Sequence, residues 1–143
     1  MPIAFSRNTL LAFAIISFVA CNTLFFTPGK ELPQLGDWFG DFSFDKLIHT
    51  AIFCGMCFLF MSYAVLFSSS IVLNKSLIFI TILFLLWAVA TELIQSYFIE
   101  GRTGSLMDVL ADAAGVLLAL FLVKMGLVEK LLSRSQKQVQ TDI

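Results

Sequence analysis

Residues 76–91, SLIFITILFLLWAVAT, decide the fold, because sixteen consecutive residues contain no Asp, Glu, Lys or Arg. Three further stretches without these residues lie at 8–29, 47–74 and 113–123. A helix that crosses the hydrocarbon core of a bilayer needs about 20 mainly apolar residues. The runs are too long and too continuous for the alternating pattern of a membrane β-barrel. The sequence therefore predicts membrane-spanning helices.

The composition excludes several other classes of protein. The 143 residues are 59% hydrophobic and 13% charged, with a mean hydropathy of +0.92. Soluble domains are about 45–50% hydrophobic and about 25% charged, and a small domain cannot hide this much apolar surface from water. A disordered chain and a disulfide-stapled secreted module are excluded as well. The net charge of −1 excludes a strongly basic nucleic-acid binder, so no nucleic-acid partner is expected.

We predict an all-α, integral membrane four-helix bundle with spans at about 9–26, 46–67, 77–98 and 106–124. Residues 1–125 form this membrane domain, and residues 126–143 form a polar cytoplasmic tail. Between the first two spans, Trp38, Phe39, Phe42 and Phe44 stand beside charged residues. Aromatic residues of this kind favour a segment at the level of the lipid headgroups.

The distribution of basic residues predicts the orientation in an inner (plasma) membrane. Cytoplasmic connections carry an excess of Lys and Arg. With four spans, the side that holds both termini has six basic residues: Arg7, Lys75, Lys124, Lys130, Arg134 and Lys137. The opposite side has three: Lys30, Lys46 and Arg102. Both termini are therefore expected in the cytoplasm, and the first and third connections on the outer side.

The cysteines allow alternative interpretations of two segments. Val19-Ala20-Cys21 resembles the end of a lipoprotein signal peptide, although apolar residues continue far enough for an uncleaved anchor, which we favour. Cys54 and Cys57 have the spacing of a redox motif. A redox thiol needs an accessible helix N-terminus, whereas these two lie about two turns into an apolar helix. We expect two packed side chains.

Polar and ionisable residues, whose burial in a membrane is energetically unfavourable, lie near the ends of three spans. Asp45 and His49 are four residues apart, and Glu92 and Gln95 are three apart, so each pair shares one helix face. All these span ends lie on one side of the membrane. We therefore expect a polar site there, formed by Asp45, Lys46, His49, Glu92, Gln95, Arg102, Ser105, Asp108 and Asp112.

The start of the last span has its own local pattern. Ser105 followed by Asp108 is an acidic form of the capping box, in which both side chains bind free backbone N–H groups. Farther along the same helix, Ala111, Gly115 and Ala119 form a stripe of small residues that favours close helix packing. This face is expected to point into the bundle.

The polar residues suit more than one chemistry. Ionisable residues within a membrane indicate a functional site by default, but Arg102 could also simply neutralise Glu92 or Asp108. His49 with carboxylates suits a divalent ion, although no sharp metal-binding spacing appears, so the sequence predicts no metal and no cofactor. Ser105 and His49 lie in no nucleophile motif. Paired acids could also perform general acid–base chemistry.

The same residues, in this order, resemble the VanZ-like membrane protein family. The match is Asp45-Lys46-x-x-His49-x-x-x-Phe53, then Glu92-x-x-Gln95, then Arg102-x-x-Ser105-x-x-Asp108-x-x-x-Asp112-x-x-Gly115, and it covers residues 45–124. The family usually has Asn where this chain has Asp112. The resemblance implies a membrane fold and a relation to a protein linked to low-level resistance to the glycopeptide teicoplanin. It defines no reaction, and we infer no resistance role from it.

The expected function is binding rather than catalysis, with membrane lipids as partners. The outward-facing site would bind the anionic headgroup of a lipid-linked or cell-envelope precursor, with Arg102 and Lys46 on its phosphate. Hydrogen bonds or proton transfer would come from His49, Glu92, Gln95 and Asp112. Two alternatives stay open: an assembly scaffold whose polar cluster only fixes helix packing, and a small enzyme that acts on a lipid carrier. The sequence leaves a homo-oligomer open as well.

Overall fold

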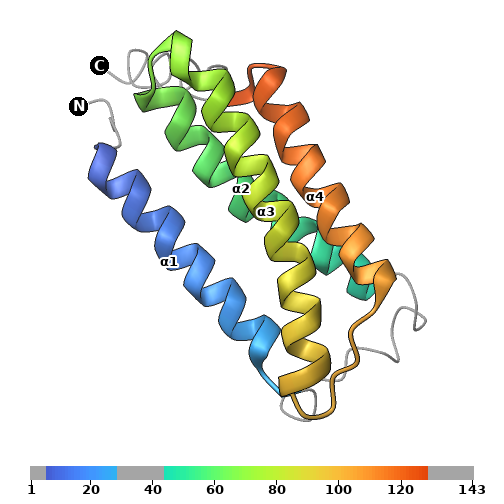
Figure 1. Ribbon diagram of the computed structural model, residues 1–143. Helices are drawn as coiled ribbons and strands as arrows, with labels where there is room; N and C mark the ends of the chain where they lie inside the picture. Colours follow the sequence, from blue (N-terminus) through green and yellow to red (C-terminus); the bar gives the residue numbers. More distant parts are fainter. Residues whose placement is uncertain (1–5, 29–43, 129–143) are drawn as a thin grey trace.

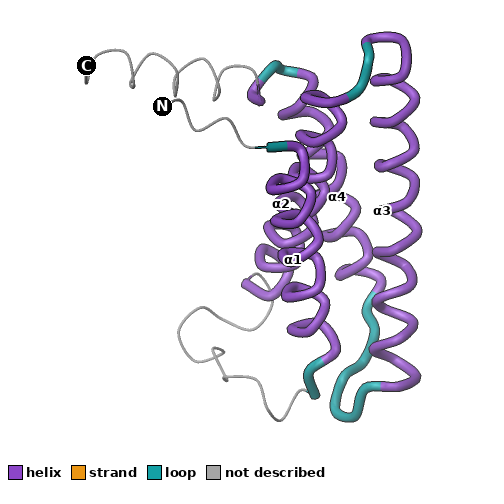
Figure 2. Tube along the Cα trace, turned by 90° about the vertical axis from the view of Figure 1, so that its left-hand side faces the viewer, coloured by secondary structure: helices purple, strands orange, loops and turns teal. Residues whose placement is uncertain are grey.

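The computed structural model describes residues 6–28 and 44–128, which form four helices. These are α1 (Arg7–Phe26), α2 (Phe44–Phe67), α3 (Ser70–Phe98) and α4 (Leu106–Lys124). The described residues contain no strand (Figure 2). All four helices are long and apolar enough to cross a membrane. The predicted all-α four-helix bundle is confirmed, and the chain is a multi-pass membrane protein.

The helices run antiparallel from one end of the bundle to the other (Figure 1). One end holds the start of α1, the short turn between α2 and α3, and the end of α4. The other end holds the last turn of α1, the first turn of α2, and the connection from α3 to α4. The predicted site residues of α2, α3 and α4 therefore lie at the same end. Which end faces the cytoplasm stays a prediction.

Helices α2 and α4 form the most extensive helix pair of the bundle. Gly115 of α4 lies against the backbone of α2, where a Cβ atom would collide with the carbonyl oxygen of Thr50 and lie 2.9 Å from the amide nitrogen of Cys54. Thr50 Oγ1 donates a hydrogen bond of 3.0 Å to the carbonyl of Ala111. The expected packing role of the small-residue stripe is confirmed, since Ala119 is fully buried too.

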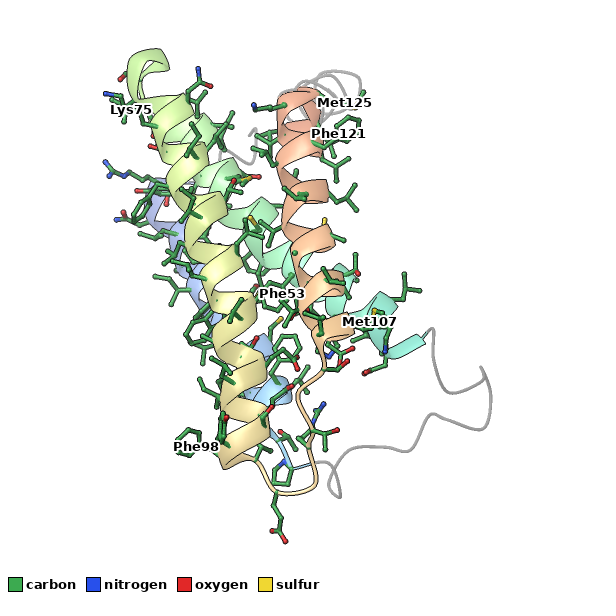
Figure 3. All side chains as sticks on the ribbon, turned by 45° about the vertical axis from the view of Figure 1, so that its right-hand side comes forward. Phe53, Lys75, Phe98, Met107, Phe121 and Met125 are labelled. Atoms are coloured by element: carbon green, nitrogen blue, oxygen red, sulfur yellow. The ribbon has the colours of Figure 1, made fainter. Side chains whose placement is uncertain are left out.

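Apolar residues fill the interior of the bundle and also cover its outside. Phe53 lies between the helices and is fully buried, whereas Met107 and Phe121 of α4 are more than half exposed (Figure 3). Phe79 and Leu86 of α3 are exposed to a similar degree. Such a surface matches lipid chains, which solvate apolar side chains as readily as the protein interior does.

Helix α1 packs on α2 and α3 through an aromatic cluster and one buried polar contact. The ring of Phe18 lies 6.2 Å from that of Phe60 and 6.1 Å from that of Phe84, both edge to face. Trp87 Nε1 donates a hydrogen bond of 2.9 Å to Asn22 Oδ1. Asn22 in turn donates to the carbonyl of Phe18, so its side chain is satisfied within the apolar surroundings.

The helices differ from the predicted spans mainly at the start of α3. The span was predicted from residue 77, but the helix begins at Ser70, directly after an extended Ser69. Asn74 and Lys75 end the apolar run without ending the helix, because a charge limits burial in lipid rather than helix formation. The aromatic segment expected at headgroup level lies outside the described residues, apart from Phe44 at the start of α2. The tail is described only to Val128, which is buried.

Candidate functional site

The nine predicted site residues occupy the end of the bundle where α2 and α4 begin and α3 ends. Five of them are buried, with exposed fractions of 8% or less: His49, Glu92, Gln95, Asp108 and Asp112. Lys46, Arg102 and Ser105 are half-buried, and Asp45 is exposed. We call the five buried residues together with Lys46 and Arg102 the polar cluster.

His49 and Asp112 form the centre of the polar cluster. His49 Nδ1 lies 3.0 Å from Asp112 Oδ1, and Asp112 is fully buried. The other ring nitrogen, Nε2, lies 3.9 Å from Asp45 Oδ1, one helical turn earlier in α2. The ring of Phe25 from α1 covers the imidazole, with ring centroids 5.0 Å apart. His49 thus faces a carboxylate on each ring nitrogen and is shielded by an aromatic ring.

Lys46 and Asp108 form a second pair beside the first. Lys46 Nζ lies 3.3 Å from Asp108 Oδ1, an ion pair between the first turns of α2 and α4. The geometry is that of a charge contact and not of a hydrogen bond, since Asp108 Oδ1 has no hydrogen-bond partner. The lysine expected to bind phosphate is therefore already close to a carboxylate.

Glu92 and Ser105 connect the end of α3 to the start of α4. Ser105 Oγ accepts from Met107 N and caps α4, as predicted. The predicted partner in the capping box, Asp108, is wrong: the Ser105 backbone N–H donates to Glu92 Oε2, at 2.9 Å. Asp108 is engaged by Lys46 instead, and the chain reversal after α3 brings Glu92 to the cap. A carboxylate is favourable there, because the N-terminus of a helix attracts negative charge.

Gln95 and Arg102 bind the C-terminal end of α1. Gln95 Nε2 donates to the carbonyl of Phe25 at 2.9 Å, and an Arg102 guanidinium nitrogen lies 3.4 Å from the carbonyl of Leu24. These carbonyls belong to the last turn of a helix, where carbonyls lack the usual partner four residues later; that of Leu24 also accepts from the Thr27 N–H. Arg102 forms no ion pair with Glu92 or with Asp108 in the described part of the chain. Simple neutralisation by Arg102 is therefore not what holds these acids.

Unpartnered polar atoms are concentrated in the polar cluster. Among the described residues, the buried side-chain nitrogen and oxygen atoms without a hydrogen-bond partner are Glu92 Oε1, Arg102 Nε, Asp108 Oδ1 and Asp112 Oδ2. Leaving such an atom buried without a hydrogen bond costs about 1–3 kcal/mol, so native proteins rarely keep one without a role. Four of them at one end of one bundle indicate a place where a ligand, an ion or water completes the bonding.

Three contact residues of the site were not predicted from the sequence. Phe25 covers His49, but nothing distinguishes it from the other Phe residues of its apolar run. Thr50 holds α2 to the backbone of α4. Ser96 accepts from the backbone N–H of Gly104 and donates to the carbonyl of Glu92, which fixes the turn before α4. Its hydroxyl bonds a backbone carbonyl four residues earlier, as Ser62 and Thr81 also do, so the sequence carries no signal that singles it out.

The cysteine pair lies deeper in α2 than the polar cluster. Cys57 is fully buried and Cys54 is half-buried, and both belong to the apolar core. All three cysteines are free thiols. The packing expected for this pair is what the structure shows.

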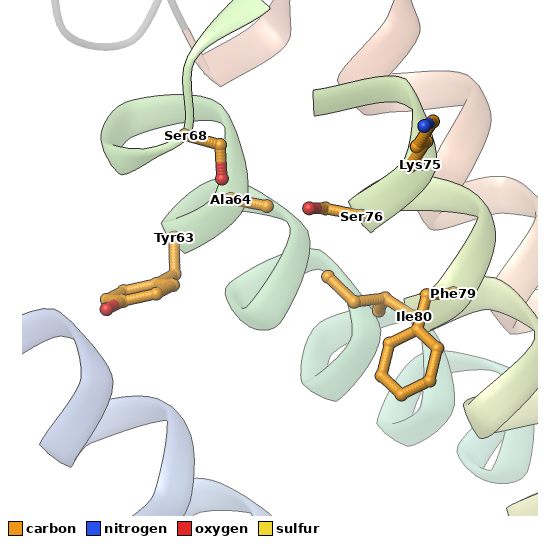
Figure 4. A pocket seen from close by; sticks show the side chains of 7 residues that line it. All are labelled: Tyr63, Ala64, Ser68, Lys75, Ser76, Phe79 and Ile80. Atoms are coloured by element: carbon orange, nitrogen blue, oxygen red, sulfur yellow. The ribbon is translucent and has the colours of Figure 1, made fainter. Parts of the chain in front are cut away.

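A shallow groove of about 390 Å³ lies between α2 and α3 at the opposite end of the bundle (Figure 4). Seven residues line it: Tyr63, Ala64, Ser68, Lys75, Ser76, Phe79 and Ile80. It is mainly apolar and holds none of the predicted site residues. Its size alone does not make it a functional site, and we consider the polar cluster the better candidate.

The fold and the polar cluster define a class: a multi-pass membrane protein whose helical bundle carries buried ionisable groups at one end. Comparisons with protein-family models, curated proteins and solved structures find no match to the chain. The resemblance to the VanZ-like family therefore remains a proposal based on the motif residues.

Proposed function

We propose that the chain is a VanZ-like protein of the inner membrane that binds an anionic headgroup at the polar cluster. Both termini are cytoplasmic in this proposal, and the cluster faces the outer side. The ligand is the phosphate-bearing headgroup of a lipid-linked or cell-envelope precursor. The observation that carries the proposal is the set of four buried polar atoms without hydrogen-bond partners, all in the polar cluster, of which only Asp108 Oδ1 has an ion-pair partner among the described residues, Lys46.

Arg102 is the residue best placed to bind phosphate. Its Nε has no hydrogen-bond partner, and its one contact to a carbonyl is long, at 3.4 Å. A guanidinium group presents several donors in a plane and binds phosphate oxygens in pairs. Lys46 would contribute from the side, where it lies 3.3 Å from Asp108. The bulk of a lipid-linked ligand would lie against the exposed apolar faces of the bundle.

The test is the thermal stability of the purified protein in detergent with added lipid. Phosphatidylglycerol and a polyprenyl phosphate are the anionic probes, phosphatidylcholine is the zwitterionic one, and inorganic phosphate separates a headgroup from the free anion. A ligand at 100 times its Kd stabilises the folded state by about 2.7 kcal/mol. We expect stabilisation by the anionic lipids that Arg102→Gln abolishes. Arg7→Gln is the matched control, because Arg7 contacts Tyr63 at the opposite end of the bundle.

Equal stabilisation by all lipids, or an unchanged response of the Arg102→Gln protein, would contradict headgroup binding. A second candidate function would then be favoured, that of a scaffold. Gln95 and Glu92 supply the observation for it, since both bind backbone groups at helix ends and so fix how the helices meet. In a scaffold, replacing Gln95 would change oligomeric state or assembly, and added lipid would have no specific effect.

A further inference from the structure

One ligand group from each of three helices meets inside the polar cluster. His49 comes from α2, Glu92 from α3 and Asp112 from α4. One imidazole nitrogen and one oxygen from each carboxylate all lie within 4.8 Å of one another, and all three residues are buried. The bundle therefore encloses a set of groups that metal ions bind.

The second observation is independent of this clustering. Glu92 is 5% exposed and Asp112 is fully buried, yet Glu92 Oε1 and Asp112 Oδ2 have no hydrogen-bond partner. These two oxygens have been removed from water without receiving a donor in return. A cation that both carboxylates face would supply the missing interaction.

We propose that His49, Glu92 and Asp112 bind a divalent transition-metal cation, with Zn²⁺ and Mn²⁺ as the best chemical fits. An imidazole suits Zn²⁺ and carboxylates suit Mn²⁺, so a mixed set accepts either. Ligand atoms lie about 2.0–2.2 Å from such an ion, so two adjacent ligands are about 3.0 Å apart in an octahedral site and about 3.4 Å apart in a tetrahedral one. The 3.0 Å between His49 Nδ1 and Asp112 Oδ1 matches the octahedral spacing. The ligand atoms of all three residues lie within 4.8 Å of one another, so side-chain rotations that shorten the longer distances close the set.

Asp45 is the carboxylate that would position His49 in this site, once a side-chain rotation brings it from 3.9 Å to hydrogen-bonding distance. A histidine that binds a metal through one ring nitrogen usually has a carboxylate or a carbonyl at the other. Asp45 Oδ1 faces His49 Nε2 at 3.9 Å, from one turn earlier in α2. Asp45, His49 and Asp108 form an alternative group of potential ligands. We favour the set with Glu92 and Asp112, because Asp45 is exposed and its contact with His49 is longer.

A bound metal ion would also reduce the repulsion between the acids of the site and a phosphate headgroup. This part of the inference rests on the proposed headgroup binding. Besides His49, the site residues include four acids, Asp45, Glu92, Asp108 and Asp112, but only two basic residues, Lys46 and Arg102. This excess of negative charge would repel a phosphate headgroup. A divalent cation held by two of the acids offsets their charge and offers phosphate oxygens a place to bind.

The test measures metal alone, without any lipid, in the purified full-length chain. The protein is stripped with a chelator, exchanged into detergent buffer with Zn²⁺ or Mn²⁺, and desalted. Bound metal is then determined by elemental mass spectrometry, and affinity by titration calorimetry. We expect one ion per chain in the wild type. Glu92→Gln and Asp112→Asn should each weaken binding by at least about tenfold, the loss seen when even an outer partner of a metal ligand is removed.

Glu100→Gln is the matched control, since it makes the same chemical change in the turn just after α3 and should leave binding unchanged. Circular dichroism and gel filtration check that each variant folds. The wild type alone suffices to overturn the proposal: less than one ion per chain at saturating metal would do so, as would equal binding by folded Glu92→Gln and Asp112→Asn. That failure would leave the lipid-induced stabilisation intact, so the two proposals are distinguished.

Discussion

His49 of α2 and Asp112 of α4 join the two most extensively packed helices through a buried contact of 3.0 Å. Sixty-three residues separate them in the chain. Their contact lies about one helical turn from Gly115, where the backbones of α2 and α4 approach closely. Close packing and the polar centre are thus parts of one helix interface, and changes in either are expected to affect the other.

The contact should appear as coupling in a double-mutant cycle. We expect His49→Ala and Asp112→Ala together to destabilise the protein by less than the sum of the single effects, with a coupling of about 1–2 kcal/mol. The measurement is reversible unfolding in mixed micelles. A cycle of His49→Ala with Tyr63→Phe is the control, because Tyr63 lies 14 residues farther along α2, at about 1.5 Å per residue. Additive effects in both cycles would contradict the contact.

Gly115 should tolerate no side chain. We expect Gly115→Ala to destabilise the protein by about 1–3 kcal/mol, because the new Cβ collides with the carbonyl of Thr50 and the backbone must shift. Gly55→Ala is the matched control: it lies in α2, and the added Cβ meets no atom within 4 Å beyond the helix's own nearby backbone. There the helix preference of Ala should leave stability unchanged or raise it by about 0.5–1 kcal/mol. Equal effects of both substitutions on unfolding would refute the close approach.

Glu92 should affect stability through the cap of α4. Glu92→Ala removes the acceptor of the Ser105 N–H and should cost about 0.5–2 kcal/mol, the usual value of a helix cap. Glu92→Gln keeps an oxygen in the same place and should cost less. Thermal unfolding of both proteins in detergent checks this order. If Glu92→Gln cost as much as Glu92→Ala, the charge rather than the hydrogen bond would hold the cap.

The proposed orientation can be tested with single cysteines. In a chain whose three native cysteines are replaced by alanine, Glu100→Cys reports on the turn between α3 and α4, and Ser69→Cys on the turn between α2 and α3. We expect a membrane-impermeant maleimide to label the first in intact cells, and the second only after permeabilisation. The reverse pattern would place the polar cluster on the cytoplasmic side.

Most of the fold could be predicted from the spacing of charges alone. The ends of α1, α2 and α4 fall within two residues of the predicted spans. The start of α3 was missed by seven residues, since the apolar run ends at Lys75 and the helix does not. The sequence also predicts that the polar residues lie at one end of the bundle, because consecutive spans cross the membrane in opposite directions.

Contacts within the polar cluster could not be predicted in the same way. The capping box is a local rule, and it assigned Asp108 to the Ser105 N–H. The observed acceptor is Glu92, thirteen residues earlier and on another helix. Likewise, Gln95 donates a hydrogen bond to a backbone carbonyl at the end of α1. Because every residue has such a carbonyl, the sequence does not indicate which one is bound. Partners across helices depend on helix rotation and tilt, which a single sequence does not specify.

The central claim is that the unpartnered atoms of the polar cluster mark a ligand site. Native mass spectrometry of the purified protein tests it most directly, with the wild type beside a variant that carries both Arg102→Ala and Glu92→Gln. We predict that the wild type retains a specific lipid or metal adduct and that the folded variant loses it. Identical spectra of the two folded proteins would contradict the claim, and the cluster would then serve only to fix helix packing.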